Sequence, residues 1–203
     1  MSNAEAQIGT PWYKAYAGER GLELTPEMEE HLAKERKPGT VLETLNFKII
    51  SGHHQTQELA YYINRQLDGR TPEESAAWAA SRRERREHAQ YRINSLIGER
   101  ALRYAAGVDP DQLTYLLARS EEDGVEIRVL EEGAVHPIEE FDFHLLKSPG
   151  EPDTVYEQGV EGNRIYRNPK RVNKFQTHFA KVSALALDVE ASRAYMDRIK
   201  KSR

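Results

Sequence analysis

The sequence contains no cysteine among its 203 residues. Without thiols the chain cannot form a disulfide framework or a thiolate metal site, and a reducing compartment is its natural setting. Long apolar runs are also missing, and the N-terminus shows no basic segment followed by an apolar one, as a secretory leader would. We therefore expect a cytoplasmic protein with no membrane partner.

An excess of positive charge is missing as well. The chain carries 29 Lys and Arg against 33 Asp and Glu, which gives a formal net charge of −4. Proteins that coat nucleic acid depend on a large basic excess, because each phosphate that they neutralise releases counterions. The sequence also contains no phosphate loop, hydrolase elbow, zinc helix or dinucleotide fingerprint. Direct DNA binding is not expected, and no motif indicates an enzyme class.

Helix start signals are distinct along the chain. Thr71 and Glu74 have the spacing of a capping box, in which each side chain bonds the backbone amide of the other residue. Asn168 and the proline after it are expected to open a long C-terminal segment, and Asp188 is the expected cap of a final helix. Another helix is expected to begin at residues 109–112.

Strand signals lie between these helices. Residues 125–129 alternate apolar and polar side chains, and residues 141–145 do the same. Residues 154–157 form a third expected strand, joined to the second by a turn typical of a hairpin, and residues 94–97 are a candidate fourth strand. We therefore expect an α+β fold, a helix-rich single domain with a small, mainly antiparallel sheet of three to four strands flanked by helices.

The most unusual local sequence is Ser-Gly-His-His-Gln-Thr at residues 51–56, between an apolar run and an expected helix. Its glycine permits a sharp turn, and the free amides at the start of the following helix can hold an anion or a polar ligand. His53 and His54 cannot both point the same way, so as a metal pair they would need further ligands from the sheet. The candidates for such ligands are Glu131, Glu132 and His136. The alternative is that both histidines cap the helix or pack at its start.

Two further groups combine charge with a defined position. Arg82 and Arg85 lie three residues apart in a predicted helix, so they share a face that could grip a phosphate or a carboxylate. Because glutamates are interspersed, the alternative is a solvated, ion-paired face. Tyr156 and Glu157 lie in the third expected strand, where Glu157 could bind an amine or act as a base. Ordinary strand alternation would instead put one of these two side chains inside and the other outside.

Several short motifs follow one another in a characteristic order. After the turn at residues 51–56 and the pair Arg82 and Arg85 come the segments Glu99 to Gly107, Gln112 to Leu116, Val125 to Leu130, Val155 to Glu157 and Ala184 to Ser192. This order resembles one family, the domain of unknown function at the C-terminus of actinobacterial, antitoxin-like transcriptional regulators of the Xre type. The turn is similar to the family's Pro-Gly-Leu-Leu-Gln-Thr segment, and the arginines are similar to its Arg-x-x-Arg-Gln helix.

In that family the domain is a sensory or partner-binding module that follows a DNA-binding helix-turn-helix. The resemblance therefore implies a ligand- or partner-binding domain at residues 40–203, preceded by an N-terminal helical extension at residues 1–39. This extension is shorter and more polar than the family's DNA-binding bundle. Ser51 stands where the family has proline, and His53 and His54 replace two leucines, so an apolar turn has become one that can titrate and hydrogen-bond.

We expect a stand-alone regulatory or sensory domain that binds a small molecule or a protein partner between the sheet and its helices, without a DNA-binding module of its own. The expected ligand-binding residues are His53, His54 and Gln55 in the turn, with Glu99, Tyr156 and Glu157 opposite. Ligand identity, cofactor and metal are left unassigned.

Two other functions remain open at this point. One is an enzyme of a small-molecule biosynthetic pathway on the same scaffold, with His53 or His54 as the acid–base group. Its carboxylate partner would be Glu131 or Glu157, with or without a metal. The other is a pure interaction protein, such as a decoy subunit that pairs with full-length regulators. A homodimer is compatible with each hypothesis.

Overall fold

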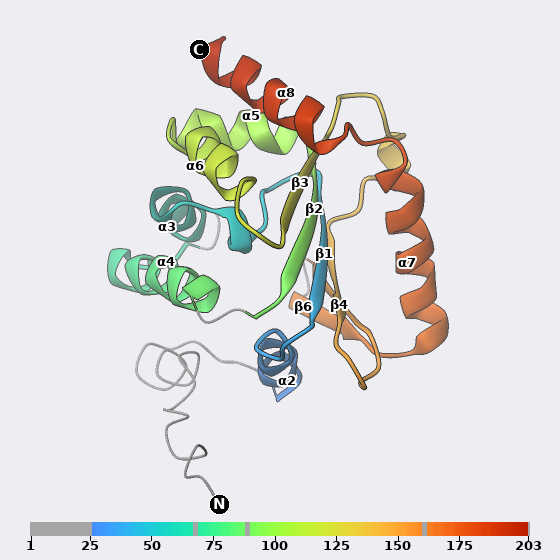
Figure 1. Cartoon of the computed structure of the whole chain (residues 1–203). Coiled ribbons are helices and arrows are strands. Elements are labelled where there is room, and N and C mark those ends of the chain that lie inside the picture. The colour runs from blue at the N-terminus through green and yellow to red at the C-terminus, as the bar shows by residue number, and fades with distance from the viewer. Residues whose placement is uncertain (1–25, 67–68, 88–89, 160–161, 203) are drawn as a thin grey trace, which may run out of the picture.

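The computed structural model describes residues 26–66, 69–87, 90–159 and 162–202 (Figure 1). Its helices are α2 (Pro26–Lys34), α3 (Gln57–Gln66), α4 (Pro72–Glu87), α5 (Glu99–Val108), α6 (Gln112–Arg119), α7 (Pro169–Ser183) and α8 (Val189–Lys201), with the short 3-10 helices η1 (Gly52–His54) and η2 (Pro137–Glu139). Its strands are β1 (Val41–Asn46), β2 (Arg92–Gly98), β3 (Val125–Leu130), β4 (Phe143–Lys147), β5 (Thr154–Gly159) and β6 (Gly162–Tyr166). None of these helices is both long and apolar enough to cross a membrane.

The described strands form one six-stranded mixed sheet in the order β3-β2-β1-β4-β5-β6. β1 pairs in parallel with β2, and β2 pairs in parallel with β3. The other pairs, β1 with β4, β4 with β5 and β5 with β6, are antiparallel. The expectation of a small, mainly antiparallel sheet of three to four strands is therefore wrong, whereas the α+β class is correct.

Two strands, β1 and β6, account for the missing part of the predicted sheet. β1 lies in the middle of the sheet, but the side chains of Thr44 and Asn46 interrupt the apolar pattern on its buried face. β6 is short and its sequence, Gly-Asn-Arg-Ile-Tyr, has little apolar character. The parallel pairing of β1 with β2 depends on a long crossover connection rather than on a tight turn, so no local motif predicts it.

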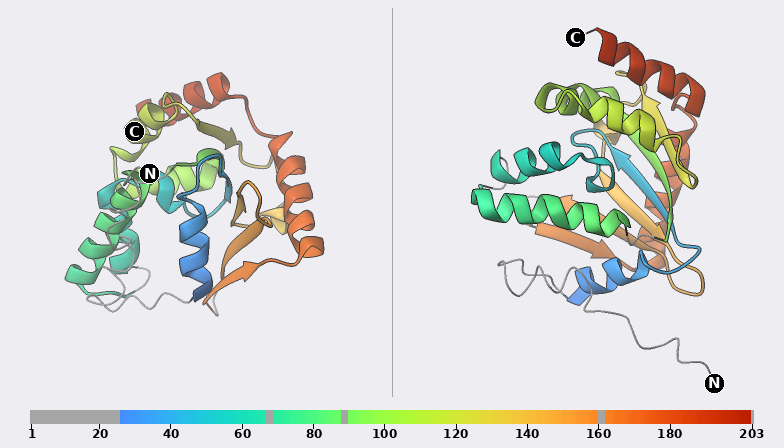
Figure 2. Two further views of the ribbon diagram at one scale, coloured as in Figure 1. Left: turned by 60° about the horizontal axis from the view of Figure 1, so that its bottom comes forward. Right: turned by 60° about the vertical axis from the view of Figure 1, so that its left-hand side comes forward.

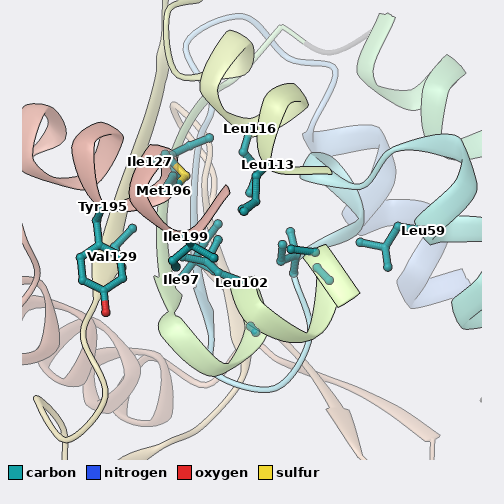
Figure 3. Packing of buried hydrophobic residues seen from close by; sticks show 14 of the residues in the cluster. Leu59, Ile97, Leu102, Leu113, Leu116, Ile127, Val129, Tyr195, Met196 and Ile199 are labelled. Atoms are coloured by element: carbon teal, nitrogen blue, oxygen red, sulfur yellow. The ribbon is translucent and has the colours of Figure 1, made fainter. Parts of the chain in front are cut away.

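Helices cover both faces of the sheet. α3, α4, α5 and α6 lie on one face and α7 lies on the other, while α8 runs across the end near β3 (Figures 1 and 2). On the first face the core is built from residues of the sheet, α3, α5, α6 and α8, including Leu59, Ile97, Leu102, Leu116, Ile127 and Met196 (Figure 3). On the second face α7 packs against strand residues that include Leu45, Leu145 and Val155.

The local start signals are confirmed. The Thr71 amide donates to the Glu74 carboxylate at 2.8 Å, and the Glu74 amide donates to Thr71 Oγ1 at 3.2 Å, which completes the predicted capping box. Asn168 caps α7 and Asp188 caps α8 through their side-chain oxygens. The predicted hairpin is present as the antiparallel pair β4 and β5. These contacts join residues that are close in sequence, which is why the sequence indicates them.

The end of α2 packs into the domain. His31, Lys34 and Glu35 are buried there, although they belong to the segment predicted as an N-terminal extension. Residues 1–25 of that extension lie outside the described residues. The division between residues 1–39 and 40–203 stays a prediction.

Candidate functional site

The turn at residues 51–56 lies on the same side of the sheet as α3 and α4 (Figure 1). Its backbone closes on itself, because the His54 amide donates to the Ser51 carbonyl at 2.8 Å. The Gln55 side-chain amide donates to the Ile50 carbonyl at 2.6 Å. Ser51, His54 and Gln55 are buried. The turn is therefore an enclosed segment of the domain rather than a surface loop.

His53 belongs to a buried polar cluster. Ser51 Oγ lies 2.9 Å from His53 Nδ1 and 3.2 Å from His144 Nε2 on β4. Glu35 Oε1 lies 3.5 Å from His53 Nε2 and 3.8 Å from His31 Nε2. His53 is 1% exposed and Glu35 is 2% exposed, so water screens these charges very little. Three imidazoles, one carboxylate and one hydroxyl thus meet between α2, η1 and β4.

Glu35 is a site residue that the sequence analysis missed. Its signal is the spacing of His31 and Glu35, which lie four residues apart and so share one helical face. The carboxylates predicted to meet the imidazoles were Glu131 and Glu157, and the contacts described below place both elsewhere. Long-range packing of α2 against the turn, rather than any local pattern, supplies the carboxylate.

His54 is fully buried against the sheet. Its Nε2 lies 2.7 Å from Ser95 Oγ on β2, and Thr44 Oγ1 on β1 donates to the same oxygen at 2.8 Å. The side-chain amide of Gln112 on α6 donates to the His54 carbonyl at 2.7 Å. His54 Nδ1 has no hydrogen-bond partner among the described residues. His53 and His54 point to different polar groups, as expected for adjacent residues.

The pKa of His54 is expected to make folding pH-dependent. Burial lowers this pKa well below 6.5, and the positive charges of Arg119, His53 and Arg86 lower it further. As the pH falls below 6.5, the imidazole of His54 takes up a proton in the unfolded chain but stays neutral in the folded chain. The contribution of neutral His54 to the free energy of unfolding is therefore complete above pH 6.5 and is lost as the pH falls. The free energy of unfolding should decline by at most about 1.4 kcal/mol per pH unit on this account.

Urea denaturation between pH 8 and pH 5 measures this decline. A His54→Gln variant should show a shallower loss of stability below pH 6.5 than the wild-type protein. The exposed His136 offers a control, since His136→Gln should retain the wild-type slope. Equal slopes in the wild type and in His54→Gln would contradict the assignment.

Two arginines of α4 hold the outer side of the turn. Arg82 donates to the Gln55 side-chain oxygen. Arg86 Nη1 donates to the carbonyls of Gly52 at 3.3 Å and Gln55 at 3.1 Å, and its guanidinium lies 5.7 Å from the ring centre of Tyr115 on α6. A Cβ on Gly52 would approach Arg82 Nε to 3.2 Å, so the missing side chain permits this close contact. The helix is thus anchored to the turn by charged hydrogen bonds.

The arginines of α4 lie in two different settings. Arg82 faces the turn and bonds an amide oxygen of Gln55, so its role in gripping a phosphate or a carboxylate stays a prediction. Arg83 and Glu87 form an exposed ion pair at 3.6 Å, as a solvated face would. The side chain of Arg85, predicted to act with Arg82, lies outside the described part of the structure.

Tyr156 and Glu157 point to opposite faces of β5, which is ordinary strand alternation. The ring of Tyr156 lies 5.6 Å from that of His144 and 5.8 Å from that of His31, measured between centres. Glu157 instead accepts a hydrogen bond from the Tyr166 hydroxyl at 2.7 Å. Tyr156 therefore borders the polar cluster, and Glu157 contacts the neighbouring strand.

Glu99 lies at the first turn of α5, beyond the carboxyl end of β2. It accepts hydrogen bonds from the Tyr195 hydroxyl, from Arg103 Nε at 2.6 Å and from the Glu132 amide at 3.1 Å. Burial alone would raise its pKa, but these bonds together lower it; the pKa of Tyr195 rises to about 12 through burial and the bond to Glu99. A small pocket here is lined by Phe47, Gly98, Glu99, Arg100, Leu130, Glu131, Val135 and Glu140.

The predicted site residues thus divide into two groups. His53, His54 and Gln55 lie together, and Tyr156 joins them through His144. The contacts described for Glu99 and Glu157 are with other groups. The three residues considered as further metal ligands lie in the connection after β3, not in the sheet. Glu131 lines the pocket at Glu99, the Glu132 amide donates to Glu99, and His136 accepts the Ile138 amide at 3.2 Å. Within the described ranges, no three or more His, Cys, Asp or Glu side chains are placed to hold a metal ion.

Comparison with known proteins identifies a family. The model of a family described as a domain of unknown function (DUF5753) matches residues 31–198. No curated protein and no solved structure matches the chain. The matched segment begins within α2 and ends within α8, so it includes the whole polar cluster and every strand described above. Because the match spans most of the sequence, the chain belongs to the DUF5753 family of domains of unknown function.

Proposed function

We propose that the protein is a sensory, regulatory domain that binds a small molecule at the polar cluster around His53 and His54. The observation that carries the proposal is the burial of Glu35 with His53 in the polar cluster, together with the burial of His54 in the same turn. Removing such groups from water costs stability, and apolar residues of similar size would avoid that cost. A role in recognising a polar ligand explains why the chain retains them.

The resemblance in motif order supports the regulatory part of the proposal. It suggests a relative of the sensory domains of Xre-type, antitoxin-like regulators from actinobacteria, acting in the cytoplasm.

The alternative to a small-molecule ligand is a protein partner. Exposed apolar side chains on a sheet edge or on the last helix would favour such a partner. The exposed large apolar residues in the described ranges are Tyr62, Tyr104, Ile138, Phe141 and Leu185, none of them in β6 or α8. A small-molecule ligand is therefore the better supported proposal.

One observation favours an enzyme as a second candidate. Ser51, His53 and Glu35 form a hydroxyl–imidazole–carboxylate series, with distances of 2.9 Å and 3.5 Å along it. In such a series the imidazole takes the hydroxyl proton and the carboxylate orients the imidazole. Hydrolysis of p-nitrophenyl acetate tests this candidate. Wild-type turnover that disappears in Ser51→Ala would support it, whereas equal rates for the two proteins would contradict it.

A thermal-shift screen against anionic, cationic and neutral metabolites tests the proposed function. A ligand present at one hundred times its Kd adds about 2.7 kcal/mol to the free energy of unfolding. In a domain of this size that should raise Tm by roughly 5–10 °C. The expected result is at least one compound with such a shift in the wild-type protein.

Variants test whether the ligand binds at the polar cluster. His53→Gln and His54→Gln, each first shown to unfold cooperatively, should lose most of the ligand-induced shift. His136→Gln changes an exposed imidazole outside the cluster and should keep it. A compound that stabilises all three variants equally binds elsewhere, which would contradict the site. A panel without any stabilising compound would contradict the function.

A further inference from the structure

We propose that the ligand carries an anionic oxygen group, a carboxylate or a phosphate, which binds between His54 Nδ1 and the guanidiniums of Arg86 and Arg119. This inference rests on the proposed function and specifies the chemistry of its ligand. It concerns the edge of the His54 ring that carries Nδ1, because Nε2 already contacts Ser95. Three elements, η1, α4 and α6, supply the donors.

The geometry of α6 brings these groups together. Gln112, Tyr115 and Arg119 follow one another at three- and four-residue intervals, so they share one helical face. Gln112 binds the His54 carbonyl at 2.7 Å, which fixes that face against the turn. Arg86 lies over the ring of Tyr115 and also binds the carbonyls of the turn. Arg119 is thereby directed to the same region, one helical turn beyond Tyr115.

The hydrogen bonds of His54 determine which ring nitrogen carries the proton. Thr44 Oγ1 donates its proton to Ser95 Oγ, so the Ser95 hydroxyl proton is directed to another acceptor. His54 Nε2, at 2.7 Å from Ser95 Oγ, is the acceptor that the geometry offers. The neutral ring must then carry its proton on Nδ1. That N–H is fully buried and has no acceptor among the described residues.

Arg119 presents a second donor of the same kind. Its Nη1 donates to Glu122, but its Nε is buried and lacks a hydrogen-bond partner among the described residues. The side chain is 14% exposed, so the guanidinium also reaches the surface. Burial lowers the pKa of His54, and the charge of Arg119, followed by those of His53 and Arg86, lowers it further. Buried donors of this kind require an acceptor, and the two guanidiniums favour a negatively charged one.

Long-range ¹H–¹⁵N spectra of the imidazole rings provide the first test, and they need no variant. The inference requires the His54 ring to be neutral and protonated on Nδ1 at pH 7.5. Titration with inorganic phosphate, or with acetate, should then shift the His54 Nδ1 signal in a saturable way, whereas acetamide, the neutral analogue, should not. Comparing phosphate with acetate identifies which anionic group the site prefers. A ring protonated on Nε2, or the absence of a saturable shift with both anions, would overturn the proposal.

Variants test the arginine contribution at constant ionic strength. Arg119→Gln should weaken phosphate binding at least tenfold, and Arg119→Lys, which keeps the charge but loses the planar fork, should weaken it less. Arg83→Gln removes an exposed arginine of α4 and should leave the affinity unchanged. Phosphate binding that survives in Arg119→Gln marks an adventitious ion only and overturns the inference.

The outcome also separates this inference from the proposed function. If a neutral compound stabilises the protein through His53 and His54 while phosphate and acetate do not bind, the function holds and the anionic ligand is wrong. If no compound of any charge binds, the function itself fails. A water molecule could instead accept the hydrogen bonds of His54 Nδ1 and Arg119 Nε. In that case the His54 Nδ1 signal would not respond to any anion, and this too would overturn the inference.

Discussion

Replacing Arg128 with methionine is expected to lower the free energy of unfolding by about 3 kcal/mol. Arg128 reaches from β3 to the connection between α7 and α8, where its Nε donates to the Leu187 carbonyl at 2.8 Å. Its Nη atoms donate to Ser183 Oγ and the Ser183 carbonyl, both at 2.9 Å, and to the Ala186 carbonyl at 2.8 Å. Methionine keeps the apolar stem but leaves these carbonyls, at the end of α7 and in the α7–α8 connection, without the arginine donors.

Urea denaturation at pH 7.5 measures this effect. Arg100→Met is the matched control, because the Arg100 side chain is 60% exposed and forms one ion pair with Glu140 at 3.3 Å. An exposed pair of this kind contributes about 0.5 kcal/mol, so the control should remain close to the wild type. If Arg128→Met lost no more stability than Arg100→Met, the α7–α8 connection would not depend on this network.

Glu99→Ala is expected to cost about 2–3 kcal/mol of folding stability. The substitution leaves the Tyr195 hydroxyl, which is buried, and the Glu132 amide without their acceptor. Because the pKa of Glu99 in the folded chain is lowered, its contribution is complete at neutral pH and is lost as the pH falls through that lowered value. The loss in Glu99→Ala should therefore be largest near pH 7 and smaller in acid.

Glu131 offers the comparison, because it lines the same pocket but is exposed. Glu131→Ala should change the free energy of unfolding by about 0.5 kcal/mol or less. Comparing Glu99→Ala with Glu131→Ala also tests the predicted ligand-binding role of Glu99. A Glu99→Ala protein with unchanged stability but no ligand binding would show that the carboxylate serves recognition instead of holding α8 against α5.

Local sequence patterns predict part of the candidate site but not all of it. The turn at residues 51–56 stands out in the sequence because Gly52 is followed by two histidines. Glu35 and Arg119 do not stand out, because Glu35 lies in the expected N-terminal extension and Arg119 ends a helix of which only the start is expected from the sequence. The sequence predicts Glu131 or Glu157 as the carboxylate beside His53, whereas Glu35 lies there. Strand alternation alone cannot say which face of a sheet a helix will cover.

The sequence by itself determined where α4, α7 and α8 begin, the hairpin of β4 and β5, and the polar character of the turn. Caps and tight turns are contacts between residues a few positions apart, so the local sequence is enough to predict them. Only the tertiary structure decided that β1 lies at the centre of a six-stranded mixed sheet, that Glu35 meets His53, and that Gln112 of α6 binds the His54 carbonyl. These contacts join distant segments, and they follow from parallel crossovers and helix packing that no local pattern encodes.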